Sequence, residues 1–531
     1  MESRGIKNPV LKNITSLETK KLTDKNRLIG SELIFLIAAA IVTITVVSTC
    51  SPLYPFNPWD DANCFFTMGR GIIRGLVPYR DLYEQKGPVL YFIYALAALI
   101  SDKSFIGAWL IECAAASVFA VFSWKTAKLF TVPSGFTIFL VPVLLGITYT
   151  IKMFNFGGNA EELCFPLLSV AFYFALRSIV ISGKLPSNTE ALVCGIITGV
   201  LFWIKYTFIG FMAGFVICIL FFAIKNKEFK KLWSLIWRFT IGFLTVTAPV
   251  LIYFLANGSL AYLWEAYFYN NIFLYFGTAD TRSLENIPVI KYIYVPLYCF
   301  YNSTVNYPFF GIMLISSAIS TAFAEKKYRK RLIFVFVITL VFALETAFTK
   351  TVIIYYYGYI LSYNFALILM PLIKGLNKLE ISYKKNPRFI KLLVSVFLSV
   401  IFLFFLCSCK NLYLMLKPKN YLSQFRIAET IRQTPDAKIL TYDVMDSGFY
   451  TAAGLMPQNR FFCYLNIEEN YPAIREEQDR LVSEGYFDYI VTSYFFDYEL
   501  ENYELVREES SVYIDFTGEG ILDGYKLYKK I

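Results

Sequence analysis

The sequence predicts a polytopic α-helical membrane protein with about eleven transmembrane helices and a small C-terminal α/β domain outside the membrane. Of its 531 residues, 56% are hydrophobic and 17% are charged, whereas soluble domains carry about 25% charged residues. The charge is also unevenly divided. Residues 1–420 hold 40 Lys and Arg against 20 Asp and Glu, while residues 421–531 hold 10 against 20. A basic, apolar body followed by an acidic segment indicates a membrane domain joined to a soluble one.

The first predicted element is a polar, basic N-terminal segment, residues 1–29. Apolar stretches follow it. A bilayer core of about 30 Å needs about 20 residues of helix, and eleven stretches approach that length. They lie near residues 30–50, 105–124, 133–151, 162–181, 189–204, 206–224, 234–256, 305–323, 331–347, 351–373 and 389–409. We therefore expect a membrane domain over residues 30–410.

Positive charge gives the expected orientation, because cytoplasmic loops are enriched in Lys and Arg. Besides the N-terminus, basic runs occur at Lys225–Lys231, Lys326–Arg331 and Lys374–Lys391. Eleven crossings from a cytoplasmic N-terminus place these runs inside the cell and the C-terminal domain outside it. The apolar residues 88–101 are short for a twelfth span and would break this parity, so we interpret them as an interfacial or re-entrant helix. The expected external loops are residues 51–104, 152–161 and 257–304.

Residues 421–531 have the pattern of a small α/β domain. Short apolar runs at Ala437–Tyr442 and Tyr489–Thr492 predict strands, and Ala473–Ser483 between them has helical amphipathic spacing. Tyr525–Tyr528 is a candidate closing strand. No Gly-rich phosphate loop precedes a helix here, so nucleotide binding is not supported, and we expect no nucleic-acid partner.

Candidate catalytic groups are carboxylates, because the sequence contains no histidine. This excludes Ser-His and Cys-His nucleophile systems and the usual zinc ligand. In the first loop, Asp60 and Asp61 precede residues 62–76, whose helical spacing predicts an amphipathic helix on the membrane surface with Arg70 on it. Partial burial would raise a carboxylate's pKa and make it a better base. Capping of that helix is the alternative interpretation of the acid pair.

The second loop offers another acid pair, Glu161 and Glu162, at the mouth of a predicted span. Carboxylates there are costly unless they face water or a polar cavity, and helix capping is again the alternative. Four cations at the same boundary could offset the charge of a phosphate-linked lipid. They are Arg80, Lys86, Lys205 and Lys350. Snorkelling to ordinary headgroups would also explain them, and Tyr356 near Lys350 is either an interface-belt aromatic or a substrate contact.

The first loop carries a recognisable pattern. The acid pair Asp60-Asp61 is followed by Gly75, by the run Pro78–Asp81 (PYRD) and by Lys86 two residues before a proline. This pattern resembles membrane glycosyltransferases of the GT-C fold. They include the protein O-mannosyltransferases, the aminoarabinose transferases acting on lipid A, and bacterial relatives of the rhizobial lipopolysaccharide galacturonosyltransferases. The basic N-terminus, the acids of the second loop and the external C-terminal domain extend the likeness.

The resemblance implies a sugar donor carried on a polyprenyl phosphate and a cell-envelope acceptor (glycan, lipid or protein) reached from the outer face of the membrane. Asp60 would match the family's base, which deprotonates the acceptor hydroxyl, and Asp61 the acid that follows it. Glu161 or Glu162 would match the acid of the second loop. The donor sugar would be inverted, with the lipid phosphate as leaving group.

The resemblance also implies a role for cations. Lys86 would match the lysine near the lipid phosphate, with Lys205 and Arg80 as helpers. Two departures stand out: the family's acid pair is commonly Asp-Glu, and many relatives carry a histidine before the late Tyr-rich segment. The absence of that histidine weakens any donor contact assigned to Lys350 and Tyr356.

Two other functions are compatible with a membrane body and an external domain. A transporter of polysaccharide or lipid-linked oligosaccharide would show internal repeats and charge spread through the spans. A non-catalytic assembly protein of the cell envelope would use its acidic domain for binding. The clustering of charge at one face favours the enzyme. Carboxylates such as Asp60, Asp61 and Glu161 could hold a divalent cation, and a metal-free mechanism is equally compatible.

Overall fold

The computed structural model describes residues 28, 30–151, 154–274, 294, 297–298, 301, 304–305, 308–347, 361–382, 386–514 and 520–531. Lys350, Tyr356 and much of the expected third external loop lie outside these residues.

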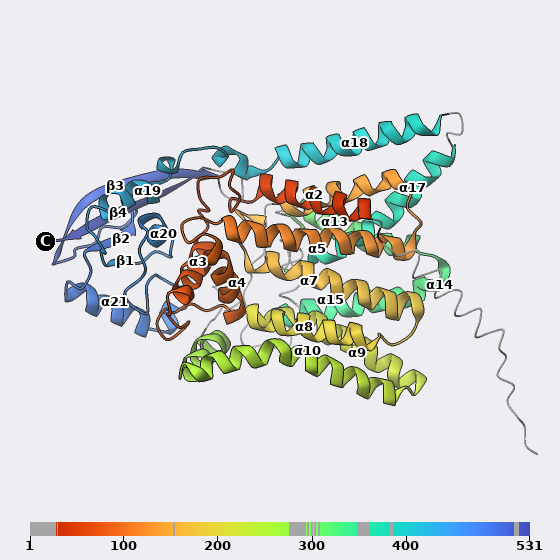
Figure 1. Ribbon diagram of the computed structural model, residues 1–531, viewed down its shortest axis with the longest axis horizontal. Coiled ribbons are helices and arrows are strands. Elements are labelled where there is room, and N and C mark those ends of the chain that lie inside the picture. Colours follow the sequence, from red (N-terminus) through yellow and green to blue (C-terminus); the bar gives the residue numbers. More distant parts are fainter. Residues whose placement is uncertain are drawn as a thin grey trace, which may run out of the picture.

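Residues 30–407 of the described chain form a helical body (Figure 1). In the described ranges, six helices are long and apolar enough to cross a bilayer. They are α2 (Gly30–Val47), α5 (Ile106–Phe130), α7 with its π-helical extension (Ala160–Ser182), α9 with the preceding 3₁₀ turn (Tyr206–Asn226), α10 (Phe229–Ala256) and α18 (Pro387–Cys407). Helices predominate because a backbone in lipid must satisfy its own hydrogen bonds.

Shorter helices complete the body. They are α6 (Leu140–Thr150), α8 (Asn188–Ile204), α11 (Leu260–Leu263), α13 (Pro308–Ser320), α14 (Lys326–Arg329), α15 (Ile333–Ala347) and α17 (Leu369–Ser382). The prediction of a polytopic helical protein is thus confirmed, while the count of eleven spans stays a prediction.

Two helices of the first loop, α3 (Asp60–Ile73) and α4 (Pro88–Ile100), lie between the long helices and the C-terminal sheet (Figure 1). Helix α4 packs against α3, α5 and α8. The turn between α9 and α10 and the short α14 lie at the opposite end of the body (Figure 1). The body therefore separates two of its basic runs from the acidic domain.

The C-terminal segment folds into a four-stranded sheet with strand order β1-β2-β4-β3. The strands are β1 (Ile439–Thr441), β2 (Tyr489–Ser493), β3 (Tyr503–Ile514) and β4 (Gly520–Lys530), and the helices α19 (Ser423–Ile431), α20 (Phe449–Ala453) and α21 (Ala473–Ser483) accompany them. Strands β1 and β2 are parallel, and β4 is antiparallel to both β2 and β3. The predicted strands and helix are found, and β3 is an additional strand.

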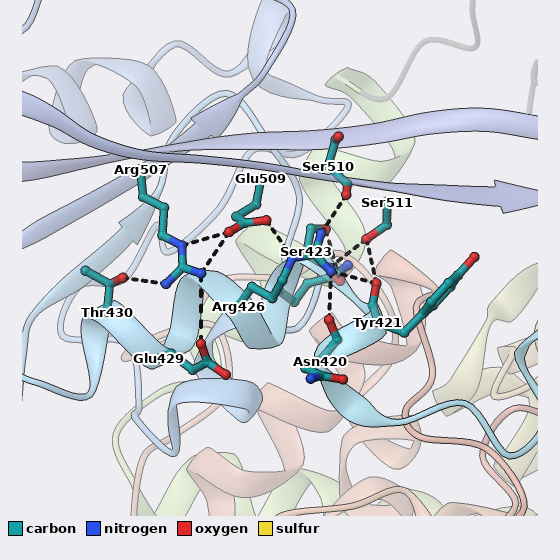
Figure 2. Close-up of polar contacts among 11 residues, drawn as sticks. Asn420, Tyr421, Ser423, Arg426, Glu429, Thr430, Arg507, Glu509, Ser510 and Ser511 are labelled. Atoms are coloured by element: carbon teal, nitrogen blue, oxygen red, sulfur yellow. Dashed lines mark hydrogen bonds and ion pairs between the residues drawn. The ribbon is translucent and has the colours of Figure 1, made fainter.

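Polar contacts fix the connection between body and sheet (Figure 2). Helix α19 follows α18, and its Arg426 Nε lies 2.5 Å from Oε2 of Glu509 on β3. Arg507 binds the other oxygen of Glu509 at 2.8 Å. The Ser423 N–H donates to Ser511 Oγ at 2.7 Å. One carboxylate shared by two guanidinium groups holds α19, the first helix after the body, against the edge strand β3.

Candidate functional site

Helix α3 begins at the acid pair that the sequence singled out. Asn57 organises the preceding turn: its Oδ1 accepts the Trp59 N–H at 2.8 Å, and its backbone carbonyl accepts Asn63 Nδ2 at 2.9 Å. Asp60 and Asp61 therefore occupy the first turn of α3, where carboxylates are stabilised by the free N–H groups. Consecutive helical residues point about 100° apart, so the two acids face different neighbours.

Asp60 faces the C-terminal domain. The hydroxyl of Ser447 donates to Asp60 Oδ1 at 2.7 Å. Burial raises the pKa of Asp60 to about 7; the Ser447 hydrogen bond lowers it, and the charges of Asp523, Asp61 and Asp446 raise it further. A carboxylate with a pKa near neutrality is suited to general-base work.

Asp61 lies near Glu84, Lys86, Glu161 and Lys205. We call these five residues the charge cluster. Burial raises the pKa of Asp61, whereas the nearby charges of Lys86 and Lys205 lower it and those of Glu84 and Glu161 raise it. Lys205 Nζ lies 2.7 Å from Glu161 Oε1, with both side chains largely buried, and Lys86 Nζ lies 3.9 Å from Glu84 Oε1. Two lysines and three acids from four parts of the chain thus share one site.

A close backbone approach brings the two lysines together. The N–H of Gly87 donates to the carbonyl of Ile204 at 3.0 Å. A Cβ at Gly87 would lie 2.0 Å from the carbonyl oxygen of Trp203, so only glycine fits here. Because Lys86 precedes Gly87 and Lys205 follows Ile204, this contact brings the backbones of the two lysines close together.

The second acid pair is divided in the same way as the first. Glu161 and Glu162 occupy the first turn of α7, and only Glu161 joins the charge cluster. Glu162 is fully buried and accepts the Gly158 N–H at 3.0 Å, while Glu112 accepts the same N–H at 2.6 Å. Gly158 has a φ of 78°, a conformation that glycine adopts at low cost. Glu112 was not singled out from the sequence, although an acid inside an apolar span is a signal for a polar site.

Arg80 has other partners than the charge cluster. Its guanidinium binds Asp81 at 2.8 Å and donates to the carbonyl of Asn257 at 3.1 Å. It therefore ties the first loop to the end of α10. Lys350 and Tyr356 lie outside the described residues.

The C-terminal domain covers α3, which the sequence did not indicate. Arg70, expected at the membrane surface, is 1% exposed and donates to Thr451 Oγ1 at 3.1 Å; burial lowers its pKa to about 10. Thr67 donates to Asp446 at 2.5 Å, and Arg460 donates to the carbonyl of Tyr79 at 2.8 Å. These contacts join residues almost 400 positions apart. Through them the C-terminal domain packs against α3 and the loop that follows it.

Asp61 and Glu161 lie in the charge cluster, but the three acids considered as metal ligands do not gather around one point. Asp60 accepts from Ser447, whereas Glu161 is paired with Lys205. Over the described ranges, no three Asp, Glu or Cys side chains gather as metal ligands would. Among the described residues, the acid side chains do not form a metal site, and the chemistry below is derived from the chain's own residues.

The arrangement of the whole chain is similar to that of two solved structures of ArnT from Cupriavidus metallidurans. The structure bound to undecaprenyl phosphate superposes with a TM-score of 0.53 at 11% identity, covering 94% of this chain and 98% of that one. The apo structure gives a TM-score of 0.58, also at 11% identity, over 93% and 97%. No family model and no curated protein matches the sequence. The likeness establishes the GT-C fold of a multi-pass membrane protein.

Proposed function

We propose that this protein is a membrane glycosyltransferase that transfers a sugar from a polyprenyl-phosphate donor to a hydroxyl of a cell-envelope acceptor. The observation that carries the proposal is the presence of a near-neutral carboxylate, Asp60, next to Asp61, which lies near the partly buried lysines Lys86 and Lys205. The ArnT structure that shares the fold is bound to undecaprenyl phosphate, which is the class of lipid that this proposal requires.

In the proposed reaction, the Asp60 carboxylate takes the proton of the acceptor hydroxyl as its oxygen attacks the anomeric carbon. The bond between that carbon and the phosphate oxygen breaks, and the lipid phosphate leaves with the electron pair. Attack opposite the leaving group inverts the anomeric configuration. Lys86 and Lys205 offset the charge that develops on the leaving phosphate. Asp61 and Glu161 keep the two ammonium groups oriented before the donor binds.

The proposed orientation places this site on the external side of the membrane, with the N-terminus in the cytoplasm. The basic turn between α9 and α10 and α14 lie at the far end of the body (Figure 1), as the charge distribution of cytoplasmic loops requires. The acceptor would then enter between α3 and the C-terminal domain, on the Asp60 side, while the lipid donor would enter at the charge cluster.

The decisive test is transfer by the purified protein in detergent. Lipid extracts of cells that lack the protein should accumulate one polyprenyl-phosphate sugar, identified by mass spectrometry. The purified chain should transfer that sugar to an acceptor extract and release polyprenyl phosphate. A transporter cannot act without two membrane sides, and an assembly protein releases no phosphate. Accumulation in cells without any transfer in detergent would therefore contradict the proposal.

The contact between Ser447 and Asp60 gives a pH prediction. A general base acts in its deprotonated form, so the rate should rise about tenfold per pH unit below the pKa near 7 and level off above it. The Ser447 hydrogen bond lowers the pKa of Asp60, so Ser447→Ala should raise it and move the acid limb to higher pH. Initial rates from pH 5 to about 9 measure this shift. An unchanged midpoint in Ser447→Ala would show that Asp60 does not control the rate.

A further inference from the structure

A hollow lies at the other end of the body from the charge cluster. It is a groove between α8, α9 and α10, with a volume of about 250 Å³. Its walls are Ala191 and Cys194 of α8, Phe215 and Ile219 of α9, and Leu232 and Ile236 of α10. The groove opens at the outer surface of the helices, where Ile236 is 45% exposed. In a bilayer, this opening faces lipid chains.

The polar end of the groove is strongly basic. Lys225 and Lys227 end α9, Lys230 and Lys231 begin α10, and Lys184 lies two residues before the groove residue Pro186. Lys231 Nζ binds Asn188 Oδ1 at the start of α8, at 2.8 Å. This joins the basic turn to the helix that forms the opposite wall.

The groove's own charge is already neutralised. Glu190 lines the wall, but it is 2.7 Å from Arg177 and also accepts the Ser187 N–H at 2.6 Å. The turn itself, residues 225–231, carries four lysines and one acid, Glu228. We call these lysines and Glu228 the rim of the groove. A net positive rim beside an apolar groove complements a ligand with an anionic head and a hydrocarbon tail.

Exposed tryptophans indicate how deep in the bilayer the basic turn lies. Trp233 and Trp237 on α10 are 71% and 61% exposed, and tryptophan is enriched at the level of lipid headgroups. The groove residues of α10 lie within about 12 Å of the basic turn, at 1.5 Å per residue. The rim is therefore at headgroup depth, and the groove descends into the acyl region.

We propose that this groove binds one acyl chain of an anionic phospholipid whose phosphate lies at the basic turn between α9 and α10. Basic pockets between transmembrane helices bind anionic headgroups in this way. The site lies at the far end of the body from Asp60, and it does not depend on the proposed sugar transfer.

Native mass spectrometry of the full chain in neutral detergent tests the proposal. Phosphatidylglycerol and phosphatidylcholine with identical chains are titrated separately. The wild type should retain phosphatidylglycerol at least tenfold more tightly. Lys227→Gln with Lys230→Gln should remove that preference, since each lysine near an anionic headgroup contributes about 1 kcal/mol. Ala191→Phe, which fills the groove, should lower the retention of both lipids.

A matched control is Lys326→Gln with Lys327→Gln on α14, which removes two exposed lysines at the same end of the body. It should keep the preference for phosphatidylglycerol. Equal affinity of the wild type for both lipids would overturn the proposal, and so would equal loss in the control. If Ala191→Phe fails to fold, the two lysine variants decide the question, because their changes are confined to exposed side chains.

Discussion

Asp60→Asn should lower the rate of sugar transfer by about 10²–10⁴-fold, the contribution of a positioned general base. Asn keeps an oxygen that accepts the Ser447 hydroxyl, but it has no basic carboxylate. The protein should remain folded, because the change removes a partly buried charge that lies near Asp446 and Asp523. The measurement is release of polyprenyl phosphate under saturating donor, together with the thermal unfolding midpoint.

Asp61→Asn is the matched control, since it makes the same change one residue along the same helix. Asp61 faces Lys86 and Lys205, so its loss should chiefly raise the KM for the lipid donor. The opposite pattern, in which Asp60→Asn is active and Asp61→Asn loses kcat, would assign the base to Asp61. The pH profile of the active variant would then identify which carboxylate titrates.

The sequence predicted the fold better than the site. Apolar length located the helices of the body, because a span in lipid needs an uninterrupted apolar run. Short apolar runs located β1 and β2. Strand β3 was missed because its residues Tyr503–Ile514 include Glu504, Arg507, Glu508 and Glu509. Its pairing with β4 compensates for this polar composition, and such tertiary pairing has no local signal.

The two acid pairs were found, but the division of each pair was not. Asp60 and Asp61, like Glu161 and Glu162, occupy first helical turns, and helical geometry alone separates their directions by about 100°. Which member faces the lysines depends on how α3 and α7 are rotated against their neighbours. That rotation is set by packing; on α3, for example, a Cβ at Gly69 would lie 2.5 Å from the backbone carbon of Tyr94 on α4.

Contacts of the C-terminal domain with α3 had no sequence signal at all. Ser447 meets Asp60 across 387 positions, and Arg70 meets Thr451 across 381. Arg70 was expected at a lipid surface because its helix is amphipathic. The polar face of that helix is instead covered by protein, which periodicity cannot distinguish from water or headgroups.

Lys205→Met should strongly slow donor-dependent transfer and also destabilise the protein. Its partner Glu161 would be left buried and without its 2.7 Å ion pair, and removal of one member of a buried pair costs about 3–5 kcal/mol. Loss of a positioned charge at the leaving phosphate should cost about 10²–10³-fold in rate. Adding Glu161→Gln should restore most of the unfolding midpoint, because it removes the unpaired charge, while the transfer remains slow.

The control for this prediction is another buried lysine–glutamate pair. Lys128 Nζ lies 2.7 Å from Glu32 Oε2, and the Lys128 side chain is 7% exposed. Lys128→Met should lower the unfolding midpoint by a similar amount, yet its transfer rate per folded molecule should match the wild type. If Lys205→Met with Glu161→Gln also transfers at the wild-type rate, Lys205 is a structural ion-pair partner. If the double variant is stable and inactive, the ammonium group acts on the donor, because stability and transfer then depend on different members of the pair.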